Sequence, residues 1–484
     1  MPAGRAARAK DKAKSMSSVS ALNSLLSSSS NGIDISSILQ AATGASSSGL
    51  DVTSAVNAAV TAAEAPEQNW QNQETSLQNQ TSALNQLQTD ATNLDNDMQS
   101  LNNITGPLSA VTVSSSNSNV VSASAASGTS AGTHTVVVSN LATTASWSSD
   151  TVASASTDLA AGSFTITTAS GPITISTGTG TSTLSDVAST INSDNLGVTA
   201  EVITDATGAR LAIVSNTSGS SSNFSVTPPT GGSLSFTQAV NGVNASLTVD
   251  GLSISSASNT VTGAIPGVTL NVLNAAPGTS VSLTVAPNTT QVTTAINQFV
   301  SDYNTLISAI NAQYSDTGSG EGVLASDPLM RNLQNDLQNA LNYINTPASG
   351  TTTVSSLASL GISVGNNGTL TVNSSTLNSA LQNNYSDVQN FFQGAALNGF
   401  ANSLDQQLTN FTSPADGAFT VDLQNLSTEY SGLQTDISNF QTNYITPLKA
   451  QLNSEYSQAE ILLQQLPQEM QQINTELGLN TKSS

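Results

Sequence analysis

Residues 67–105, EQNWQNQETSLQNQTSALNQLQTDATNLDNDMQSLNNIT, contain neither glycine nor proline. Apolar residues recur there every seven positions, in two stripes that lie three places apart. The stripes are Trp70, Leu77, Leu84, Ala91 and Met98, and Leu87, Leu94 and Leu101. This heptad pattern predicts one helix with an apolar seam, about 57 Å long at 1.5 Å per residue. We expect Pro66 to separate it from the preceding segment and Gly106-Pro107 to end it.

The C-terminal end of the chain has a similar pattern. Before Pro447, apolar and aromatic residues follow one heptad phase: Leu426, Leu433 and Phe440, with Tyr430, Ile437 and Tyr444. After Pro447, a second phase holds Leu452, Ala459, Leu466 and Ile473, with Tyr456, Leu463, Met470 and Leu477. We expect a second coiled-coil segment, with the phase shifted at Pro447 and a kink at Pro467.

Two similar segments precede the long helix. GIDISSILQAA (32–42) recurs seventeen positions later as GLDVTSAVNAA (49–59). We expect Asp34 and Asp51 to cap two short helices. In the second copy Val52, Val56 and Ala59 share one helix face with Val60 and Ala63. Residues 1–31, basic and then Ser-rich, predict a disordered leader.

The middle of the chain predicts β structure over residues 108–288. SFTITTASGPITIST (163–177) has the alternation of a hairpin, and Asp250-Gly251 is typical of a type I′ turn. A short amphipathic helix is expected at 184–193. Further helices are predicted at 290–310, 327–344 and about 375–393, with a small hairpin at 361–372 that turns at Asn367-Gly368.

These elements predict an α+β multidomain fold. Discontinuous helical domains, built from both ends of the chain, would flank inserted antiparallel β-rich domains. The expected parts are a leader (1–31), a terminal coiled-coil leg (32–66 with 430–484) and a helical bundle with a small hairpin (67–106 with 289–429). Two β-rich domains would follow, at 107–145 with 238–288 and, inserted, at 146–237 with one short helix.

Composition excludes several classes of function. The net charge is −22 although only 8% of residues are charged, and five of nine basic residues lie in the first fourteen positions. A nucleic-acid partner requires a basic face and a membrane span requires about 18 apolar residues, so we expect neither partner. The absence of cysteine excludes disulfides and thiol chemistry. The N-terminus is too polar for a Sec signal peptide, so we expect export without one.

Three motifs with potential chemistry have simpler interpretations. His134, the one histidine in the sequence, lies in a predicted strand. Asp316-Thr317-Gly318-Ser319 resembles an aspartic-protease turn but has no second copy to complete a carboxylate pair. GTGTST (178–183) is Gly-rich but lacks the Lys of a P-loop. We expect no catalytic, cofactor-binding or metal-binding residues, and no enzyme activity.

The heptad seams allow two interpretations. They could pack within one chain as a helical bundle, or the last stripe could contact other subunits. The candidate interface residues are Val52, Val56, Ala59, Leu452, Tyr456, Ala459, Leu463, Leu466, Met470, Ile473 and Leu477.

Several segments resemble the hook-associated protein 2 family of bacterial flagellar filament caps. They include SGLDVTSAVNAAVTAAEAP (48–66), AGTHTVVVSNLA (131–142) and LSDVASTINSDNLGVTAEVITDATGARLAIVSN (184–216). The others are NASLTVDGLSISSASNTVTGAIPGVTLNV (244–272), TAINQFVSDYNTLISAI (294–310) and SLASLGISVGNNGTLTV (356–372). They occur in the family's order and span nearly the whole chain. The extra GIDISSILQAA copy, the basic leader and Pro467 depart from the family pattern.

The resemblance implies a non-enzymatic cap at the extracellular distal tip of the filament. It implies an annular homo-oligomer, commonly a homopentamer, that retains exported flagellin and promotes its folding and polymerisation. An export chaperone and the flagellar type III export apparatus are further implied partners, and some members contribute to adhesion. Two rival interpretations are another axial flagellar protein, such as flagellin or a hook–filament junction protein, and a secreted adhesin. An adhesin would not need heptads at both ends.

Overall fold

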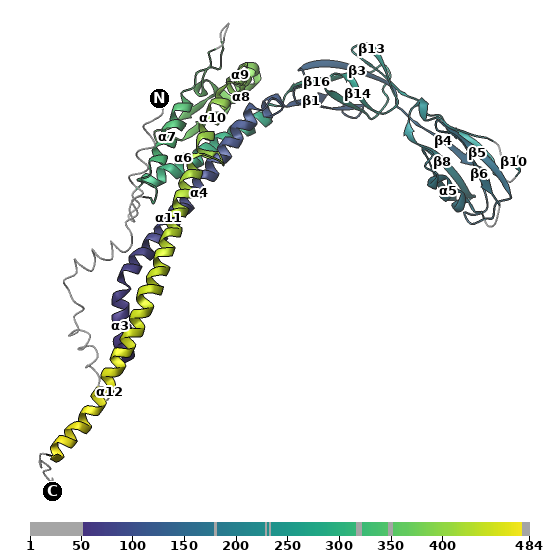
Figure 1. Ribbon diagram of the computed structural model, residues 1–484. Helices are drawn as coiled ribbons and strands as arrows, with labels where there is room; N and C mark the ends of the chain where they lie inside the picture. Colours follow the sequence, from purple (N-terminus) through teal and green to yellow (C-terminus); the bar gives the residue numbers. More distant parts are fainter. Residues whose placement is uncertain are drawn as a thin grey trace, which may run out of the picture. The chain divides into compact units, whose positions relative to one another are not determined.

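The computed structural model describes residues 52–178, 182–227, 230–231, 234–315, 322–346 and 352–476. The leader, the first GIDISSILQAA copy and Asp316–Ser319 lie outside these residues. The chain divides into two compact units, Met1–Asn93 with Thr305–Leu337 and Gln407–Ser484, and Leu94–Asn304 with Gln338–Gln406. Figure 1 labels the elements.

The helices combine long amphipathic segments with short connecting ones. They are α3 (Val52–Ala63), α4 (Ala65–Asn102), α5 (Leu184–Ser193), α6 (Thr289–Tyr314), α7 (Pro328–Leu341), α8 (Ser374–Asn383), α9 (Tyr385–Gln393), α10 (Phe400–Thr412), α11 (Ala418–Phe440) and α12 (Thr446–Glu476). A π-helical turn, Gln441–Ile445, joins α11 to α12. Short 3₁₀ turns occur at Pro107–Ser109, Ser220–Ser222 and Leu357–Leu360.

The strands lie mostly between α4 and α6. They are β1 (Val111–Ser115), β2 (Val121–Ala125), β3 (Gly132–Asn140), β4 (Thr144–Ser149), β5 (Gly162–Thr168), β6 (Gly171–Thr177), β7 (Val198–Asp205), β8 (Gly208–Ser218), β9 (Ser225–Val226), β10 (Thr230–Gly231), β11 (Phe236–Val240), β12 (Ala245–Val249), β13 (Leu252–Ser256), β14 (Thr260–Ile265), β15 (Val268–Val272), β16 (Val281–Pro287), β17 (Ile362–Val364) and β18 (Leu370–Val372). All their pairings are antiparallel, so the predicted α+β class is confirmed.

One β core is built from strands on both sides of the inserted segment. A five-stranded sheet, β1-β16-β3-β12-β13, and a three-stranded sheet, β14-β15-β2, contribute apolar residues to it. Their inward residues alternate along each strand, as in Val136 and Val138 of β3. Asp250 and Gly251 both have positive φ, at 48° and 83°, which confirms the type I′ turn between β12 and β13.

The inserted segment has a second β core with one helix. The sheets β11-β4-β8-β7 and β10-β5-β6, with β9 beside β5, share it with α5. The predicted hairpin is confirmed, since Phe164 pairs with Ile175 and Ile166 with Ile173. The helix predicted at 184–193 is also confirmed. Its N-terminus has a capping box, in which Thr183 and Asp186 satisfy each other's backbone amides.

The long seam of α4 is buried as predicted. Leu84, Leu87, Ala91, Leu94, Met98 and Leu101 are each at most 1% exposed. In the second unit an aromatic cluster includes two residues from the middle of α6. Within it, Phe299 contacts Tyr303 and Phe400, and Phe391 contacts Phe392 and Tyr343.

Several helix predictions need correction. The single helix expected at 375–393 is two helices, because Asn384, with φ −135° and ψ 38°, leaves the helical region between them. α7 ends at Leu341 rather than Ile344. The sequence prediction omitted α10, although Phe400, Leu404, Leu408 and Phe411 have helical spacing and are buried.

Asp97 of α4 lies beside Asp302 of α6. Burial, together with the negative charge of Asp302 and a hydrogen bond with it, raises the pKa of Asp97 from 3.8 to about 7. The folded chain therefore binds more protons than the unfolded chain between about pH 4 and pH 7. Stability should fall as the pH rises through this range.

We predict that Asp97→Asn removes this pH dependence and stabilises the protein above pH 7. The gain at pH 8 should be about 1–2 kcal/mol, because partial exposure to solvent reduces the full linkage energy. Urea unfolding at pH 5 and pH 8 measures the effect, with the exposed Asp150→Asn as control. An unchanged difference between the two pH values in Asp97→Asn would contradict the prediction.

Candidate assembly interface

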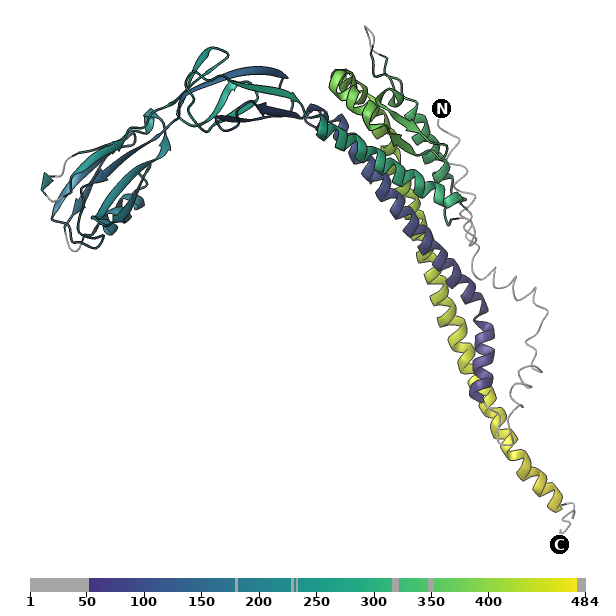
Figure 2. The same cartoon turned by 180° about the vertical axis from the view of Figure 1, so that it is seen from behind.

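The two ends of the described chain form one antiparallel helix pair. We call this pair the leg and define it as residues 52–78 with 430–476. Gln78 Nε2 donates to Tyr430 Oη (2.9 Å), Gln434 Nε2 donates to Glu74 Oε1 (3.0 Å), and Gln441 donates to Glu67. In each pair the residue numbers add up to 508, so one register holds along this stretch. Figure 2 shows α4 and α11, and further along α3 and α12, side by side.

The register places two helix irregularities opposite each other. Glu64 separates α3 from α4, and by the same register it lies opposite Tyr444 in the π-turn. The break adjoins Pro66 as predicted, since proline lacks an amide proton and restricts the residue before it. The break in one helix and the π-turn in the other therefore lie at the same level of the leg.

The π-turn, rather than Pro447 itself, accounts for the shift of heptad phase. Thr446 N–H donates to Gln441 O, five residues back. In an α-helix, residues five apart point about 140° away from each other. The π-turn brings Phe440 and Ile445 into one cluster instead, so the seam continues from Phe440 to Ile445 and then every seven residues to Leu452 and Ala459. The two predicted phases are thus one seam.

A small hydrophobic cluster holds the leg together. Val56, Val60, Phe440 and Ile445 are buried, and Val52, Ala63, Trp70, Leu452 and Tyr456 pack against them. The Trp70 and Phe440 rings meet edge to face, with centroids 5.3 Å apart. Tyr444 stacks on Phe440 at 5.2 Å. Such aromatic pairs add about 0.5–1.5 kcal/mol each beyond the apolar area that they bury.

The candidate interface residues divide into two groups. Val52, Val56, Leu452 and Tyr456 contribute to the cluster, Ala59 is buried, and Ala459 is half-buried, so these six pack within one chain. Leu463, Leu466, Met470 and Ile473 belong to α12, but their side chains lie outside the described set, as does the whole of Leu477. Contact of this last group with other subunits stays a prediction.

α12 also exposes apolar residues that the heptad analysis did not select. Ile461 is 54% exposed and Leu462 is 62% exposed. Their helical neighbours Ser457, Gln458, Gln464 and Gln465 are uncharged. The run Ile461-Leu462-Leu463 indicates this exposure in the sequence, because three consecutive apolar residues cannot all face one seam. α12 continues through Pro467, and the kink expected there stays a prediction.

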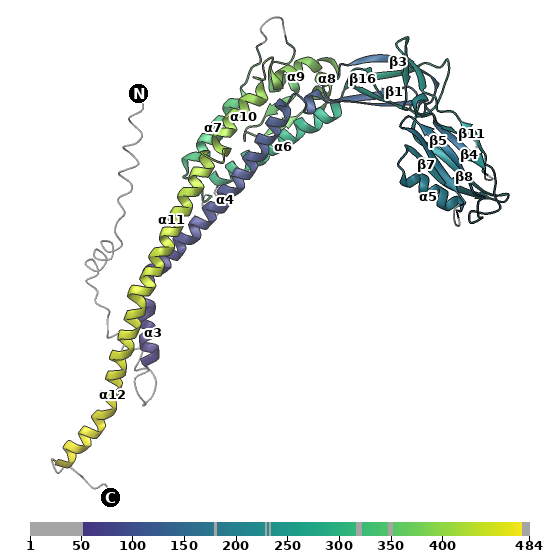
Figure 3. The same cartoon turned by 45° about the vertical axis from the view of Figure 1, so that its right-hand side comes forward.

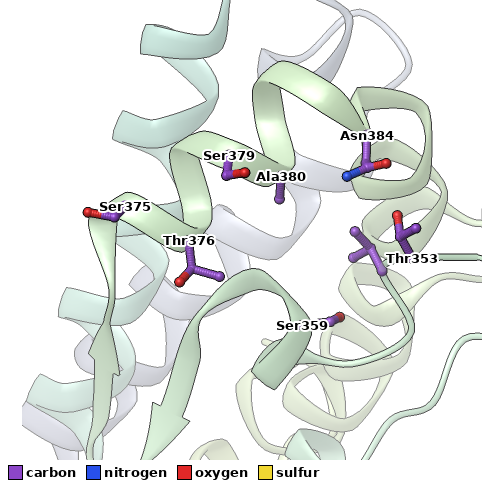
Figure 4. Close-up of a pocket in the computed structure, with 8 residues that line it drawn as sticks. Thr353, Ser359, Ser375, Thr376, Ser379, Ala380 and Asn384 are labelled. Carbon is purple, nitrogen blue, oxygen red and sulfur yellow. The ribbon is translucent and has the colours of Figure 1, made fainter.

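The second unit contains a pocket of about 350 Å³ beside α8 (Figure 4). Its lining residues are Thr353, Val354, Ser359, Ser375, Thr376, Ser379, Ala380 and Asn384. The Thr353 hydroxyl donates to Asp387 and the Ser359 hydroxyl to the Ser356 carbonyl. Because none of the lining side chains titrates near neutral pH, the pocket offers no general acid or base.

The histidine singled out in the sequence has a structural partner. His134 lies in β3 as predicted, and its Nδ1 is 2.8 Å from Asp250 Oδ2. Hydrogen bonds with His134 and with the Thr135 amide hold the pKa of Asp250 below its usual value. The described residues contain no group of three or more His, Cys, Asp or Glu side chains placed to hold a metal ion. Within the same residues, no helix has the length and apolar character of a membrane span.

A leg built from both ends of the chain, with antiparallel β sheets inserted between them, defines a structural protein of the axial type. Sequence models of a known family match the chain over most of its length. The model of the flagellar hook-associated protein 2 C-terminus matches residues 242–468, and that of the N-terminus matches 48–145. The flagellin hook IN motif matches 163–217. The chain belongs to the flagellar hook-associated protein 2 family.

Individual relatives agree with this assignment. The B-type flagellar hook-associated protein 2 of Pseudomonas aeruginosa is 27% identical over 334 residues, which cover 62% of this chain and 69% of the relative. The flagellar hook-associated protein 2 of Aeromonas caviae is 26% identical over 307 residues, covering 57% and 63%. The crystal structure of the flagellar cap protein FliD D1-D2-D3 domains from Escherichia coli matches with a TM-score of 0.57 at 26% identity. That match covers 71% of this chain and 99% of the other.

We predict that Phe440→Ala opens the leg locally. Loss of this buried ring from the cluster should cost about 3 kcal/mol. Amide hydrogen exchange in α3 and in the first turns of α12 should become faster, while the β cores keep their protection. Val421→Ala, in α11 but outside the leg and 44% exposed, is the control and should leave exchange unchanged. Equal exchange in the two variants would contradict the role of Phe440.

Proposed function

We propose that the chain caps the distal end of the growing flagellar filament, where it retains exported flagellin and promotes its folding and polymerisation. Family membership supports this role. The observation that carries it is the leg, which pairs both ends of the chain and exposes Ile461 and Leu462 on α12. A filament tip built from helices would offer matching apolar surfaces. The rival axial and adhesin roles are not favoured by these relatives.

The proposed contact is weak enough to be broken and reformed. Fully burying one Ile or Leu side chain stabilises a complex by about 1.5–3 kcal/mol, and these two are already partly covered. Among the residues one, three or four positions away on α12, only Glu460 is charged, so the contact would depend only modestly on salt. Such a leg could detach from and rebind the tip each time a flagellin subunit adds.

The remaining parts of the proposal concern assembly. The cap would be an annular homo-oligomer, a homopentamer, outside the cell. It would contact flagellin, and before assembly an export chaperone and the flagellar type III apparatus. The leg domain would comprise 32–66 with 430–484, the bundle 67–106 with 289–429, and the β domains 107–145 with 238–288 and 146–237. The role needs no catalytic step.

We predict that Ile461→Gln with Leu462→Gln impairs capping without unfolding the chain. Cells producing this variant should have shorter filaments and release more flagellin into the medium, because the leg loses its exposed apolar contact. Filament length by electron microscopy and flagellin in the supernatant measure the effect. The control is Val421→Gln, also an exposed apolar residue but in α11 outside the leg. Normal filaments from a stably folded double variant would count against the proposed contact.

A further inference from the structure

The packing of α3 shows how a short helix binds the C-terminal helix. α3 buries Ala55, Val56, Ala59 and Val60. Its partners in the cluster include Ile445, Leu452 and Tyr456. Figure 3 shows α3 beside the N-terminal part of α12. The contact needs only one apolar stripe on each helix.

α12 continues well beyond the part that α3 covers. It runs twenty residues past Tyr456 to Glu476, which is about 30 Å of helix. Its sequence repeats the α3-binding stripe fourteen residues later, where Ala459, Leu466 and Met470 take the places of Ile445, Leu452 and Tyr456. A twelve-residue helix such as α3 is about 18 Å long, so α12 has room for a second one.

The chain itself contains a second segment with the α3 pattern. In 32–42, Ile35, Ile38, Leu39 and Ala42 stand where α3 has Val52, Ala55, Val56 and Ala59. Asp34 stands where the second copy has Asp51, with the same N-capping chemistry. Residues 43–51, TGASSSGLD, connect the copies. A fourteen-residue displacement along α12 requires this linker to bridge only about 10 Å, well within the reach of nine residues.

We propose that residues 32–42 bind the distal part of α12 in their own chain as a second helix of the α3 type. Leu39 would lie beside Leu466 and Ile35 beside Met470, as Val56 and Val52 accompany Leu452 and Tyr456. The same chain is the favoured source because a short linker holds the segment at an effective concentration of the order of millimolar. The duplication would thereby lengthen the leg.

This docking leaves Ile461 of the proposed capping contact free. Ile461 lies two positions beyond Ala459, which is about 200° around the helix and so nearly opposite the stripe. Leu462, four positions before Leu466, is only about 40° from it and borders the stripe, so docking would partly cover Leu462 and leave Ile461 exposed. The two proposals are still tested separately, because the cysteine pairs below leave Ile461 and Leu462 unchanged.

Disulfide trapping tests the proposal in the full-length chain, which has no cysteine of its own. Leu39→Cys with Leu466→Cys should form an intramolecular disulfide under mild oxidation about tenfold faster than Leu39→Cys with Gln468→Cys, because Gln468 lies off the stripe. Val56→Cys with Leu452→Cys, within the observed cluster, is the positive control. Non-reducing electrophoresis and mass spectrometry identify the product.

Each outcome either supports or overturns the docking of residues 32–42 on α12. A fast intramolecular bond supports docking within the chain. Equal rates for the two Leu39 pairs, while the positive control reacts, overturn it, and a covalent dimer overturns the assignment to the same chain. As a second measurement without cysteine, Leu39→Asn should accelerate amide exchange in residues 462–476, whereas Ser37→Asn should not. No acceleration in Leu39→Asn would also overturn the proposal.

Discussion

The contact between Trp70 and Phe440 is the interaction on which the leg depends. These residues come from opposite ends of the chain, and their rings meet within one cluster of side chains. A two-helix pair has a small interior, so losing one ring removes a large share of its buried apolar area. The cluster keeps the two termini together and so defines the part of the molecule suited to assembly.

Hydrogen bonds donated by uncharged glutamine side chains hold the register that the cluster requires. Gln78, Gln434 and Gln441 make the contacts between the helices, and their partners are a tyrosine hydroxyl and two glutamates. None of the three is an ion pair. Because none of these contacts joins two opposite charges, they respond less to ionic strength than ion pairs do, and the leg should keep its register over a wide range of salt, which suits a protein that acts outside the cell.

Local patterns predicted most elements but not every boundary. The α4 seam, the 163–177 hairpin, the Asp250-Gly251 turn and α5 follow from residue spacing, because each depends on neighbours within a few positions. α10 was also readable from its spacing but was overlooked. The break at Asn384 was not readable, since asparagine occurs both inside and between helices and its backbone angles depend on packing. The sequence indicates the exposure of Ile461 and Leu462 only indirectly, because their run contains more apolar residues than one seam can bury.

By itself, the sequence determined that both ends are heptad helices, that the middle is antiparallel β structure and that the family is that of flagellar caps. It also showed two heptad phases near Pro447. Only the tertiary structure decided that these phases form one seam, because a π-turn has no distinct residue pattern and is recognised by its five-residue hydrogen bond. The tertiary structure also decided which seam residues are buried against another helix of the same chain. Burial is a property of the partner surface, and the partner of Val56 lies almost four hundred residues away in sequence.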